Sequence, residues 1–315
     1  MAAPDETKHF KFLGTTGTGK STAIRELLGG ALRRGDRAVI ADPDGGYLAR
    51  FHEPNRGDVI LNPFEPRSLK WDVFAEIRNP YDFEQLARSL IPDGAGDERM
   101  WRGYGQTFLA AVMRQAHGAG VRNGAELYRL LTAAPLEELR FLLEGTAAEP
   151  FVAAGNERMF GSIRSVSTSA VSALDFVNSQ QSALFSIRQW VKEGGGVLFL
   201  PYEADQIAAL RSVVSTWMRI AIFETMTLGE GDAHLWFVVD ERCAGSDRRI
   251  EVRTGAAAKI WGPVRVGISE HRAGDCDLWA RRSRDHRGEL REYADLAMFG
   301  VGGWGEGSVR SRPHW

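Results

Sequence analysis

The chain has 315 residues, of which 43% are hydrophobic and 25% charged, and its formal net charge is −2. This composition is typical of a globular protein with one large domain or two modest ones, and it excludes a disordered or fibrous chain. No window holds 18 consecutive apolar residues, and the polar start MAAPDETKHF does not resemble a secretory signal, so we expect a soluble, cytoplasmic protein. The two cysteines, Cys243 and Cys276, are too few for a disulfide framework and lack the spacing of a zinc site.

The net charge hides an uneven distribution. Residues 242–315 contain 13 Arg, one Lys and 10 acidic residues, a balance of +4, whereas residues 1–241 carry −6. Both cysteines and four of the nine tryptophans also lie in the last segment. The composition therefore changes abruptly near residue 242.

The first elements in chain order are predicted to be a strand, a glycine loop and a helix. Residues 9–13 form a short β-prone run that stops at Gly14, and after Lys20 the apolar residues recur at helical spacing. Two more strands are predicted at 37–41 and 58–61, each ending in a turn signal. These apolar runs do not alternate with polar residues, which indicates strands buried on both faces, as in a parallel sheet.

From about residue 80 to residue 192 the pattern becomes helical, and no strand is predicted within it. The helices are expected at 83–90, 98–115, 125–131, 136–143 and 156–177. A strand at 196–200, a helix at about 204–226 and a strand at 234–241 follow. The order predicts an α/β fold in which an all-α insertion at 78–192 separates two nucleotide-binding parts, residues 1–77 and 193–241.

A phosphate-binding loop of the pattern G-x-x-x-x-G-K-[ST] lies between the first strand and the first helix. Its glycines let backbone N–H groups surround a phosphate, while the positive end of the helix points at the anion. Lys20 is expected to reach the β- and γ-phosphates of ATP, and Ser21 to bind Mg²⁺. The alternative is a chance glycine-rich turn. The candidate nucleotide-binding residues are Gly14, Thr15, Thr16, Gly17, Thr18, Gly19, Lys20, Ser21 and Thr22.

The strand predicted at 234–241 ends in two carboxylates. Asp240 is the second candidate ligand of Mg²⁺, and Glu241 is the candidate general base that activates the attacking water. A strand end of this kind is often only the solvated start of a loop. Together with the phosphate-binding loop, it predicts the Walker B element of a P-loop ATPase, with Lys20 and Glu241 as the catalytic residues.

Four further segments give a more specific resemblance. The chain from Lys8 to Glu241 resembles the cytoplasmic ATPase of conjugative coupling proteins, the TraD/TrwB group of type IV secretion. The matching segments are the phosphate-binding loop, residues 34–45 with Asp-Pro-Asp-Gly, residues 58–63 with Ile-Leu-Asn-Pro, and Trp101-Arg102-Gly103-Tyr104. The resemblance implies a P-loop NTPase fold of RecA-like type with an all-α insertion domain. It also implies a hexameric motor at an inner membrane that hydrolyses ATP to move single-stranded DNA, with a relaxase and secretion components as partners.

The helical insertion admits two interpretations. Its apolar stripes are typical of an ordinary packed bundle without a partner of its own. Arg99, Arg102 and Arg114 could instead face DNA, although charged helix faces are usually only solvated. The acidic balance of residues 1–241 argues against a large DNA-binding surface but is compatible with a narrow basic pore.

The sequence departs from the family in two places. Only about eight residues precede the first strand, so we expect the membrane anchor of the family to be absent and the chain to be a truncated form. After Glu241 the family continues with a helix and a strand ending near Gly-x-Gln-Ser, and this chain shows neither. Reading the codons of residues 242–298 displaced by one nucleotide permits a family-like continuation, so we expect residues 242–315 to be translated out of frame. A divergent C-terminal domain is the alternative.

This expectation has consequences for activity and for the sheet. Without its later strands, the strand before Asp240 is expected to have an unpaired edge, which promotes aggregation. Besides a DNA-translocating ATPase, two other functions remain open: a non-catalytic remnant, and a helicase or packaging ATPase unrelated to secretion.

Overall fold

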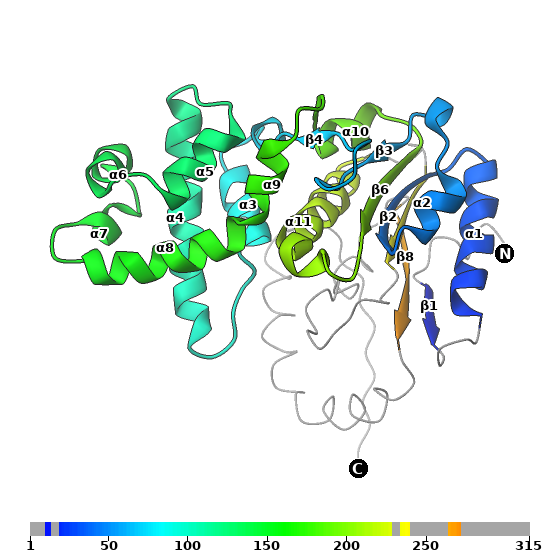
Figure 1. The fold of residues 1–315 in the computed structure, drawn as a ribbon, viewed down its shortest axis with the longest axis horizontal. Coiled ribbons are helices and arrows are strands. Elements are labelled where there is room, and N and C mark those ends of the chain that lie inside the picture. Colours follow the sequence, from blue (N-terminus) through cyan, green and yellow to red (C-terminus); the bar gives the residue numbers. More distant parts are fainter. Residues whose placement is uncertain (1–9, 14–18, 229–233, 240–263, 272–315) are drawn as a thin grey trace, which may run out of the picture.

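The computed structural model describes residues 10–13, 19–228, 234–239 and 264–271. A six-stranded sheet, in which every pair of neighbouring strands is parallel, forms one end of the molecule (Figure 1). Its strands, in the spatial order β1-β8-β7-β2-β6-β3, are β1 Phe10–Leu13, β8 Val264–His271, β7 Leu235–Val239, β2 Arg37–Pro43, β6 Val197–Tyr202 and β3 Val59–Ile60. The predicted parallel α/β sheet is confirmed.

The centre of the sheet is strand β2, which pairs with β6 on one side and with β7 on the other. Ala38 lies opposite Val197 in β6 and opposite Trp236 in β7. Every residue of β2 and β6 is buried. These strands are covered on both faces, which explains why their apolar residues run without alternation.

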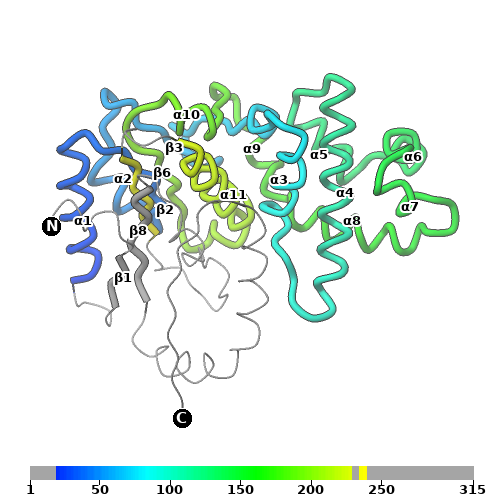
Figure 2. Tube along the Cα trace, turned by 180° about the vertical axis from the view of Figure 1, so that it is seen from behind, coloured from blue at the N-terminus to red at the C-terminus, as the bar shows by residue number. Residues whose placement is uncertain are grey.

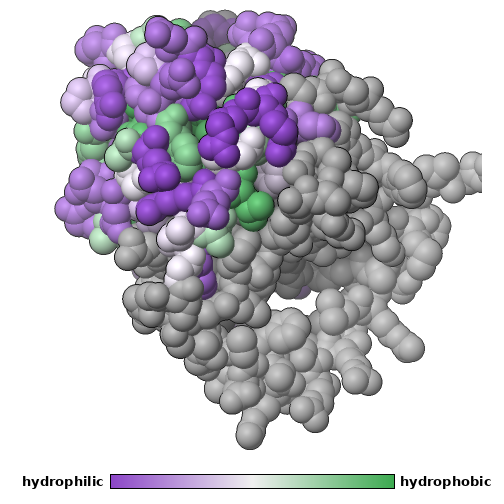
Figure 3. Space-filling view, turned by 90° about the vertical axis from the view of Figure 1, so that its right-hand side faces the viewer, coloured by the Kyte–Doolittle hydropathy of each residue, from purple (hydrophilic) through white to green (hydrophobic). Residues whose placement is uncertain are grey.

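Helices cover both faces of the sheet. Helix α1, Lys20–Arg33, and the short helix α2, Gly46–Phe51, pack on one face, and helix α11, Ile207–Thr225, lies on the other (Figures 1 and 2). Seen from the α1 side, the described surface is mainly hydrophilic around a small hydrophobic area (Figure 3). Among the described residues, no helix has the length and apolar character needed to cross a bilayer.

The helical insertion lies beyond α11, at the end of the molecule opposite α1 (Figure 2). Its helices are α3 Asp82–Leu90, α4 Glu98–Gly118, α5 Gly124–Thr132, α6 Leu136–Leu143, α7 Glu149–Val152, α8 Glu157–Val171 and α9 Ala173–Ser179, and α10 Ile187–Glu193 leads back to the sheet. Four of the five predicted helices are therefore confirmed within a few residues. The long helix α4 packs against α3 and α8 and carries the core of the insertion.

Two local expectations were wrong. A strand does lie within the predicted all-helical region, because β5, Leu184–Phe185, pairs with β4, Lys70–Trp71. The helix expected at 156–177 is two helices that meet at Ser172, in a serine-rich stretch where the hydroxyls of Ser167 and Ser172 donate to backbone carbonyls. Such back-bonding competes with the helical ladder and bends helices. The turn predicted after β2 is confirmed at Asp44 and Gly45, and the short helix α2, which was not predicted, follows it directly.

Short turns complete the chain between β2 and α3. The 3₁₀ turns Pro54–Arg56 and Phe74–Glu76 flank β3 and β4. The second turn leads into the insertion, and its last residue, Glu76, is fully buried.

Strand β8 also corrects the expectation of an unpaired sheet edge. It belongs to the segment predicted to be out of frame, and it lies between β1 and β7, with Leu235 opposite Val264 and Phe10 opposite Ile268. Strand β7 is therefore paired on both sides. The physical reason is local, since residues 264–268, Val-Arg-Val-Gly-Ile, are rich in β-branched side chains that favour a strand.

A buried cluster of charges joins the insertion to the sheet. Arg188 of α10 donates to Asp82 of α3 at 2.9 Å and to Glu224 of α11 at 3.0 Å. Glu224 also accepts from Arg78 at 2.7 Å and lies 3.3 Å from Lys192. The cluster therefore ties the segments that lead into and out of the insertion to the helix that covers the sheet.

Glu76 is the most deeply buried carboxyl group beside this cluster. Its oxygens accept hydrogen bonds from the backbone N–H groups of Ile187 and Arg188, at 2.7 and 3.1 Å, and from the Trp71 indole at 3.1 Å. Burial raises the pKa of Glu76 from 4.5 to about 7, and these donors oppose the shift without cancelling it. Protonated Glu76 is thus the form that the fold favours.

The pKa of Glu76 predicts how stability changes with pH. Because the folded-state value lies above the unfolded one, the stabilising contribution is complete below about pH 4.5 and is lost as the pH rises through about 7. The loss should reach roughly 3 kcal/mol in the free energy of unfolding. Glu76→Gln, which is uncharged at every pH, should abolish this dependence in urea unfolding at pH 5 and pH 8. Glu193→Gln, an exposed change on α10, is the control, and equal pH slopes in all three proteins would contradict the assignment.

Candidate functional site

The candidate site lies where the parallel strands end. Because β1, β8, β7 and β2 are parallel, their last residues lie at the same edge of the sheet. Only β8 stands between β1 and β7, so the two outer strands run about 10 Å apart. The loop after β1 leads to Lys20, and Asp240 directly follows Val239. The fold therefore brings to one edge the ends of β1 and β7, which are the described residues next to the predicted phosphate-binding loop and the predicted Walker B carboxylates.

The N-terminus of α1 is built to accept an anion. Gly19 precedes the helix with φ at 82°, a left-handed conformation that strains any residue with a side chain. In the described part of the chain, no side chain caps this end of the helix, and its first turn contains no acidic residue. The N–H groups of a helix's first turn and the helix dipole both favour a phosphate at such an end.

The structure describes the last four of the nine candidate nucleotide-binding residues. Gly19 and Thr22 are exposed, Ser21 is half-buried, and Lys20 is 8% exposed at the first position of α1. The burial of Lys20 shows that its side chain is not extended into solvent. Gly14, Thr15, Thr16, Gly17 and Thr18, together with Asp240 and Glu241, lie outside the described residues, so their roles remain predictions.

The Asp-Pro-Asp-Gly segment forms the turn after β2. Asp42 is fully buried, and its carboxylate accepts the backbone N–H groups of Tyr47 and Leu48, the latter at 2.7 Å. Burial raises the pKa of Asp42, while these donors and the nearby Arg25 act against the shift. Asp44 has φ at 62° and donates its N–H to the Tyr202 carbonyl of β6 at 2.9 Å. The buried Asp42 therefore fixes the turn at the carboxyl edge of the sheet.

The Ile-Leu-Asn-Pro segment fastens the end of β3 to the end of β6. The Asn62 amide donates to the carbonyl of Pro201 at 2.9 Å and to Gln206 at 3.0 Å, and its oxygen accepts the N–H of Phe64. Asn62 is buried, so each of these bonds satisfies a group that water cannot reach.

The Trp101-Arg102-Gly103-Tyr104 segment lies on α4, away from the sheet edge. The rings of Trp101 and Tyr104 meet edge to face at 6.0 Å, and Tyr104 also contacts Phe151 at 5.3 Å. Arg102 pairs with Glu98 one turn earlier at 3.2 Å. This segment therefore contributes to the insertion and not to the nucleotide-binding edge.

Two residues at the edge were missed by sequence reasoning. Arg25 of α1 lies over the Tyr47 ring at 5.4 Å and faces the turn that holds Asp42. Gln206, just before α11, accepts from Asn62 and from the backbone N–H of Glu203. Neither residue could be recognised as part of the site from the sequence. Arg25 lies within a helix and Gln206 lies in a loop, and only the fold brings them to the edge.

The comparisons with known proteins agree with this architecture. The family described as "Type IV secretion-system coupling protein DNA-binding domain" matches residues 1–244. A curated relative, coupling protein TraD of Escherichia coli (strain K12), is 33% identical over 244 residues, which cover 75% of this chain and 34% of TraD. The chain thus spans about a third of the length of this relative.

Solved structures of the coupling protein TrwB are similar in fold. Unbound TrwBdeltaN70 is 34% identical with a TM-score of 0.75, and the match covers 86% of this chain and 64% of TrwBdeltaN70. TrwB in complex with the non-hydrolysable GTP analogue GDPNP is 35% identical (TM-score 0.74, covering 85% and 64%), and TrwB with ADP and Mg²⁺ is 32% identical (TM-score 0.73, covering 86% and 64%).

The family match covers well over half of the chain, and the similarity to TrwB confirms the P-loop NTPase type of fold with its helical insertion. This chain belongs to the family of type IV secretion-system coupling proteins.

Proposed function

We propose that this chain is the nucleotide-binding core of an ATP-driven motor that transfers single-stranded DNA. The observation that carries the proposal is the N-terminus of α1, which has no side-chain cap and no acid in its first turn and follows β1 in the sheet that contains β7, the strand before Asp240 and Glu241. The complexes of TrwB with GDPNP and with ADP and Mg²⁺ support ATP and Mg²⁺ as the ligands. Family membership also favours this function over a helicase or packaging ATPase unrelated to secretion.

The proposed roles follow the chemistry of each side chain. Lys20 neutralises the β- and γ-phosphates, while Ser21 and Asp240 hold Mg²⁺, which supplies charge stabilisation to the transferred phosphoryl group. Glu241 accepts a proton from the attacking water. The N–H groups of Gly14 to Thr22 and the dipole of α1 orient the phosphates.

The partners belong to the proposal as well. DNA is the substrate that the family description supports, and components of a type IV secretion system are the expected protein partners. We further propose that the motor works in the cytoplasm at an inner membrane, receives its DNA from a relaxase, and assembles as a homo-hexamer.

Lys20→Ala should abolish the stabilisation of the protein by ATP and Mg²⁺. At a ligand concentration a hundredfold above the dissociation constant, bound nucleotide contributes about 2.7 kcal/mol to the free energy of unfolding. Thermal unfolding with and without ATP-Mg²⁺ measures this difference, and Lys70→Ala, at a lysine that contacts Asn178, serves as the control. An equal shift in the Lys20 variant and the unchanged protein would remove Lys20 from the site.

Glu241→Gln should retain ATP binding and lose turnover, because the amide keeps the shape of the side chain but cannot accept the proton. The matched control is Glu203→Gln, an exposed acid that follows β6 at the same edge of the sheet. Phosphate release and the nucleotide-dependent melting shift are measured together. Simultaneous loss of binding and turnover would assign Glu241 a structural role.

The segment after residue 241 carries a separate proposal. The family match ends at residue 244, close to the point where the composition changes. This boundary supports a shift of reading frame at codon 242, which would replace the family segment that senses the γ-phosphate. A chain altered in this way would be a nucleotide-binding remnant with little activity.

Restoring the frame at codon 242 should therefore raise DNA-stimulated ATP hydrolysis strongly. The restored segment would again contact the γ-phosphate. One contact of this type in related motors, a cation from a neighbouring subunit, is worth ~10³–10⁵ in the rate of hydrolysis. Turnover is compared between the chain as given and the restored chain, with and without single-stranded DNA. If the restored chain is no faster, residues 242–315 are a genuine domain and the frame is correct.

A further inference from the structure

Helix α10 is the short segment through which the chain leaves the insertion and returns to the sheet (Figure 1). It comprises only the seven residues Ile187–Glu193. A helix of this length is unstable on its own in water, so α10 keeps its helical form only while other parts of the molecule stabilise it. The contacts at its two ends show which parts these are.

The first N–H groups of α10 are bound by the segment that enters the insertion. Glu76 accepts the backbone N–H of Ile187 at 2.7 Å and that of Arg188 at 3.1 Å, although it precedes Ile187 by 111 residues. The hydroxyl of Ser186 accepts the next N–H group, that of Gln189, at 3.2 Å. The start of α10 is therefore fully capped only where the entry segment lies beside it.

The last carbonyls of α10 are bound by the central strand of the sheet. Arg37, the first residue of β2, donates to the carbonyl of Val191 at 2.8 Å and to that of Trp190. Its guanidinium carbon also lies 4.5 Å from the centroid of the Trp190 ring. The helix dipole favours a cation at this end, and the planar fork of an arginine can bind two carbonyls at once. Arg37 is buried, so water does not replace it in these contacts.

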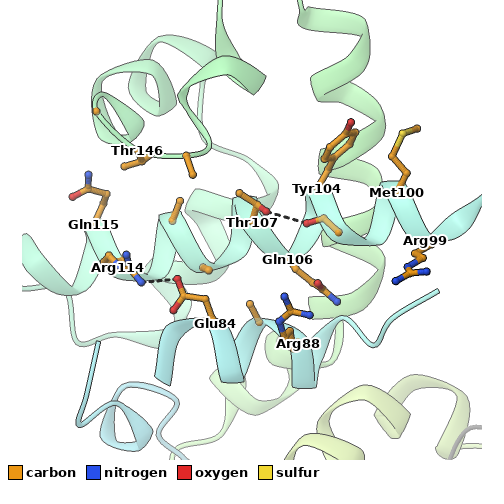
Figure 4. Close-up of a pocket in the computed structure, with 16 residues that line it drawn as sticks. Glu84, Arg88, Arg99, Met100, Tyr104, Gln106, Thr107, Arg114, Gln115 and Thr146 are labelled. Carbon is orange, nitrogen blue, oxygen red and sulfur yellow. Dashed lines mark hydrogen bonds and ion pairs between the residues drawn. The ribbon is translucent and has the colours of Figure 1, made fainter. Parts of the chain in front are cut away.

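Between its two ends, α10 also holds the insertion. Arg188 donates to Asp82 of α3 at 2.9 Å. Helix α3 is in turn fastened to α4, where Gln106 donates to a backbone carbonyl at the end of α3 at 2.8 Å and Arg114 lies 2.6 Å from Glu84. The last three side chains line a surface groove of about 800 Å³ (Figure 4). Because α4 carries the core of the insertion, a shift of α3 relative to α10 displaces the insertion relative to the sheet.

Strand β2 extends from α10 to the predicted nucleotide-binding edge. All of its residues, Arg37–Pro43, are buried, and it ends in the turn that Asp42 fixes. At roughly 3.3 Å per residue, its two ends lie about 20 Å apart. It is paired along its length with β6 and with β7, the strand before Asp240. A close-packed strand of this kind transmits strain between its ends.

We propose that α10 couples the nucleotide state of the sheet edge to the position of the insertion, and that Arg37 is the positioning residue on which this coupling depends. The inference rests on the proposed function, because nucleotide is the signal. It goes beyond that function, which assigns no role to α10 or to the amino end of β2. The two arrangements are the helix capped by Glu76 and Arg37 together and a form in which its last turn opens. Nucleotide that fills the edge restrains β2 and β7 and thereby favours the capped form.

Arg37→Met in the full chain tests the coupling, because methionine keeps an unbranched apolar side chain while the charge and the donors are removed. Arg164→Met is the matched control. Arg164 likewise donates to two backbone carbonyls, those of Leu131 and Ala134 near the end of α5, and lies over the Phe160 ring at 5.5 Å. Its contacts remain within the insertion, so its loss should leave the link to the sheet intact.

Hydrogen exchange is measured by mass spectrometry with and without Mg²⁺ and the non-hydrolysable ATP analogue ADPNP, together with the melting shift. In the unchanged chain, nucleotide should slow exchange in residues 187–193 and 76–90 by about fivefold or more, the lower end of usual couplings between sites. Arg37→Met should lose this slowing but keep the melting shift, because Arg37 lies at the opposite edge of the sheet from the predicted phosphate-binding loop. Arg164→Met should behave as the unchanged chain does.

Arg37→Lys is the conservative variant, and it replaces Arg37→Met if that variant does not fold. It keeps the cation but not the planar fork of donors, so it should retain the melting shift and show a slowing between those of Arg37→Met and the unchanged chain.

The other outcomes overturn the inference. It fails if nucleotide shifts the melting temperature of the unchanged chain without changing exchange in residues 187–193. It fails if the Arg37 variants keep the full slowing, or if Arg164→Met loses it as well, because the loss would then reflect a general loosening of the insertion. Absence of any melting shift in the unchanged chain would refute the proposed nucleotide function, and the inference with it.

Discussion

The structure depends on a cluster of opposite charges at the base of the insertion, in which Arg188, Asp82 and Glu224 are buried. Arg188, Arg78 and Lys192 face Glu224 and Asp82, with Glu76 beside them. A buried ion is costly unless its partners are placed well, and removing one partner leaves the other uncompensated. Because these groups come from three segments that lie far apart in the chain, they can all be satisfied only when the start of the insertion, α10 and α11 adopt one arrangement. The cluster thus fixes how a domain-sized insertion joins the sheet.

The hydrophobic core also joins the insertion to the sheet. One continuous core runs from the insertion through α11 to residues of β2, β6 and β7 on the face of the sheet opposite α1. A second core lies between α1, α2 and the other face. Strand β2 contributes to both, with Val39 in the first and Ile40 in the second, and it pairs with the strand that leads to Asp240. A movement of α11 would therefore be transmitted through packed side chains to the strands that end at the predicted nucleotide-binding edge.

The sequence allowed much of the fold and part of the site to be predicted, for identifiable reasons. The strands at 37–43 and 197–202 were found because strands covered on both faces are apolar throughout. Strand β5 was missed because two residues have no period, and the bend at Ser172 because the apolar spacing continues across it. Arg188 could not be distinguished from a surface arginine, since its burial arises from segments that are far apart in the chain. Lys20 was found because the phosphate-binding loop is a contiguous motif whose chemistry depends on local backbone.

Strand β8 shows that the segment beyond residue 241 contributes to the sheet, although its composition differs from that of the rest of the chain. This strand lies between the strand of the phosphate-binding loop and the strand that leads to Asp240, so some segment must occupy that place for the two to keep their separation. The register sets Glu270 opposite Phe12 and His271 opposite Leu13. These positions lie at the carboxyl ends of β8 and β1, the edge at which the predicted phosphate-binding loop follows β1 in the chain. A strand at this place is therefore required to hold β1 and β7 in one sheet, whatever the composition of the segment around it.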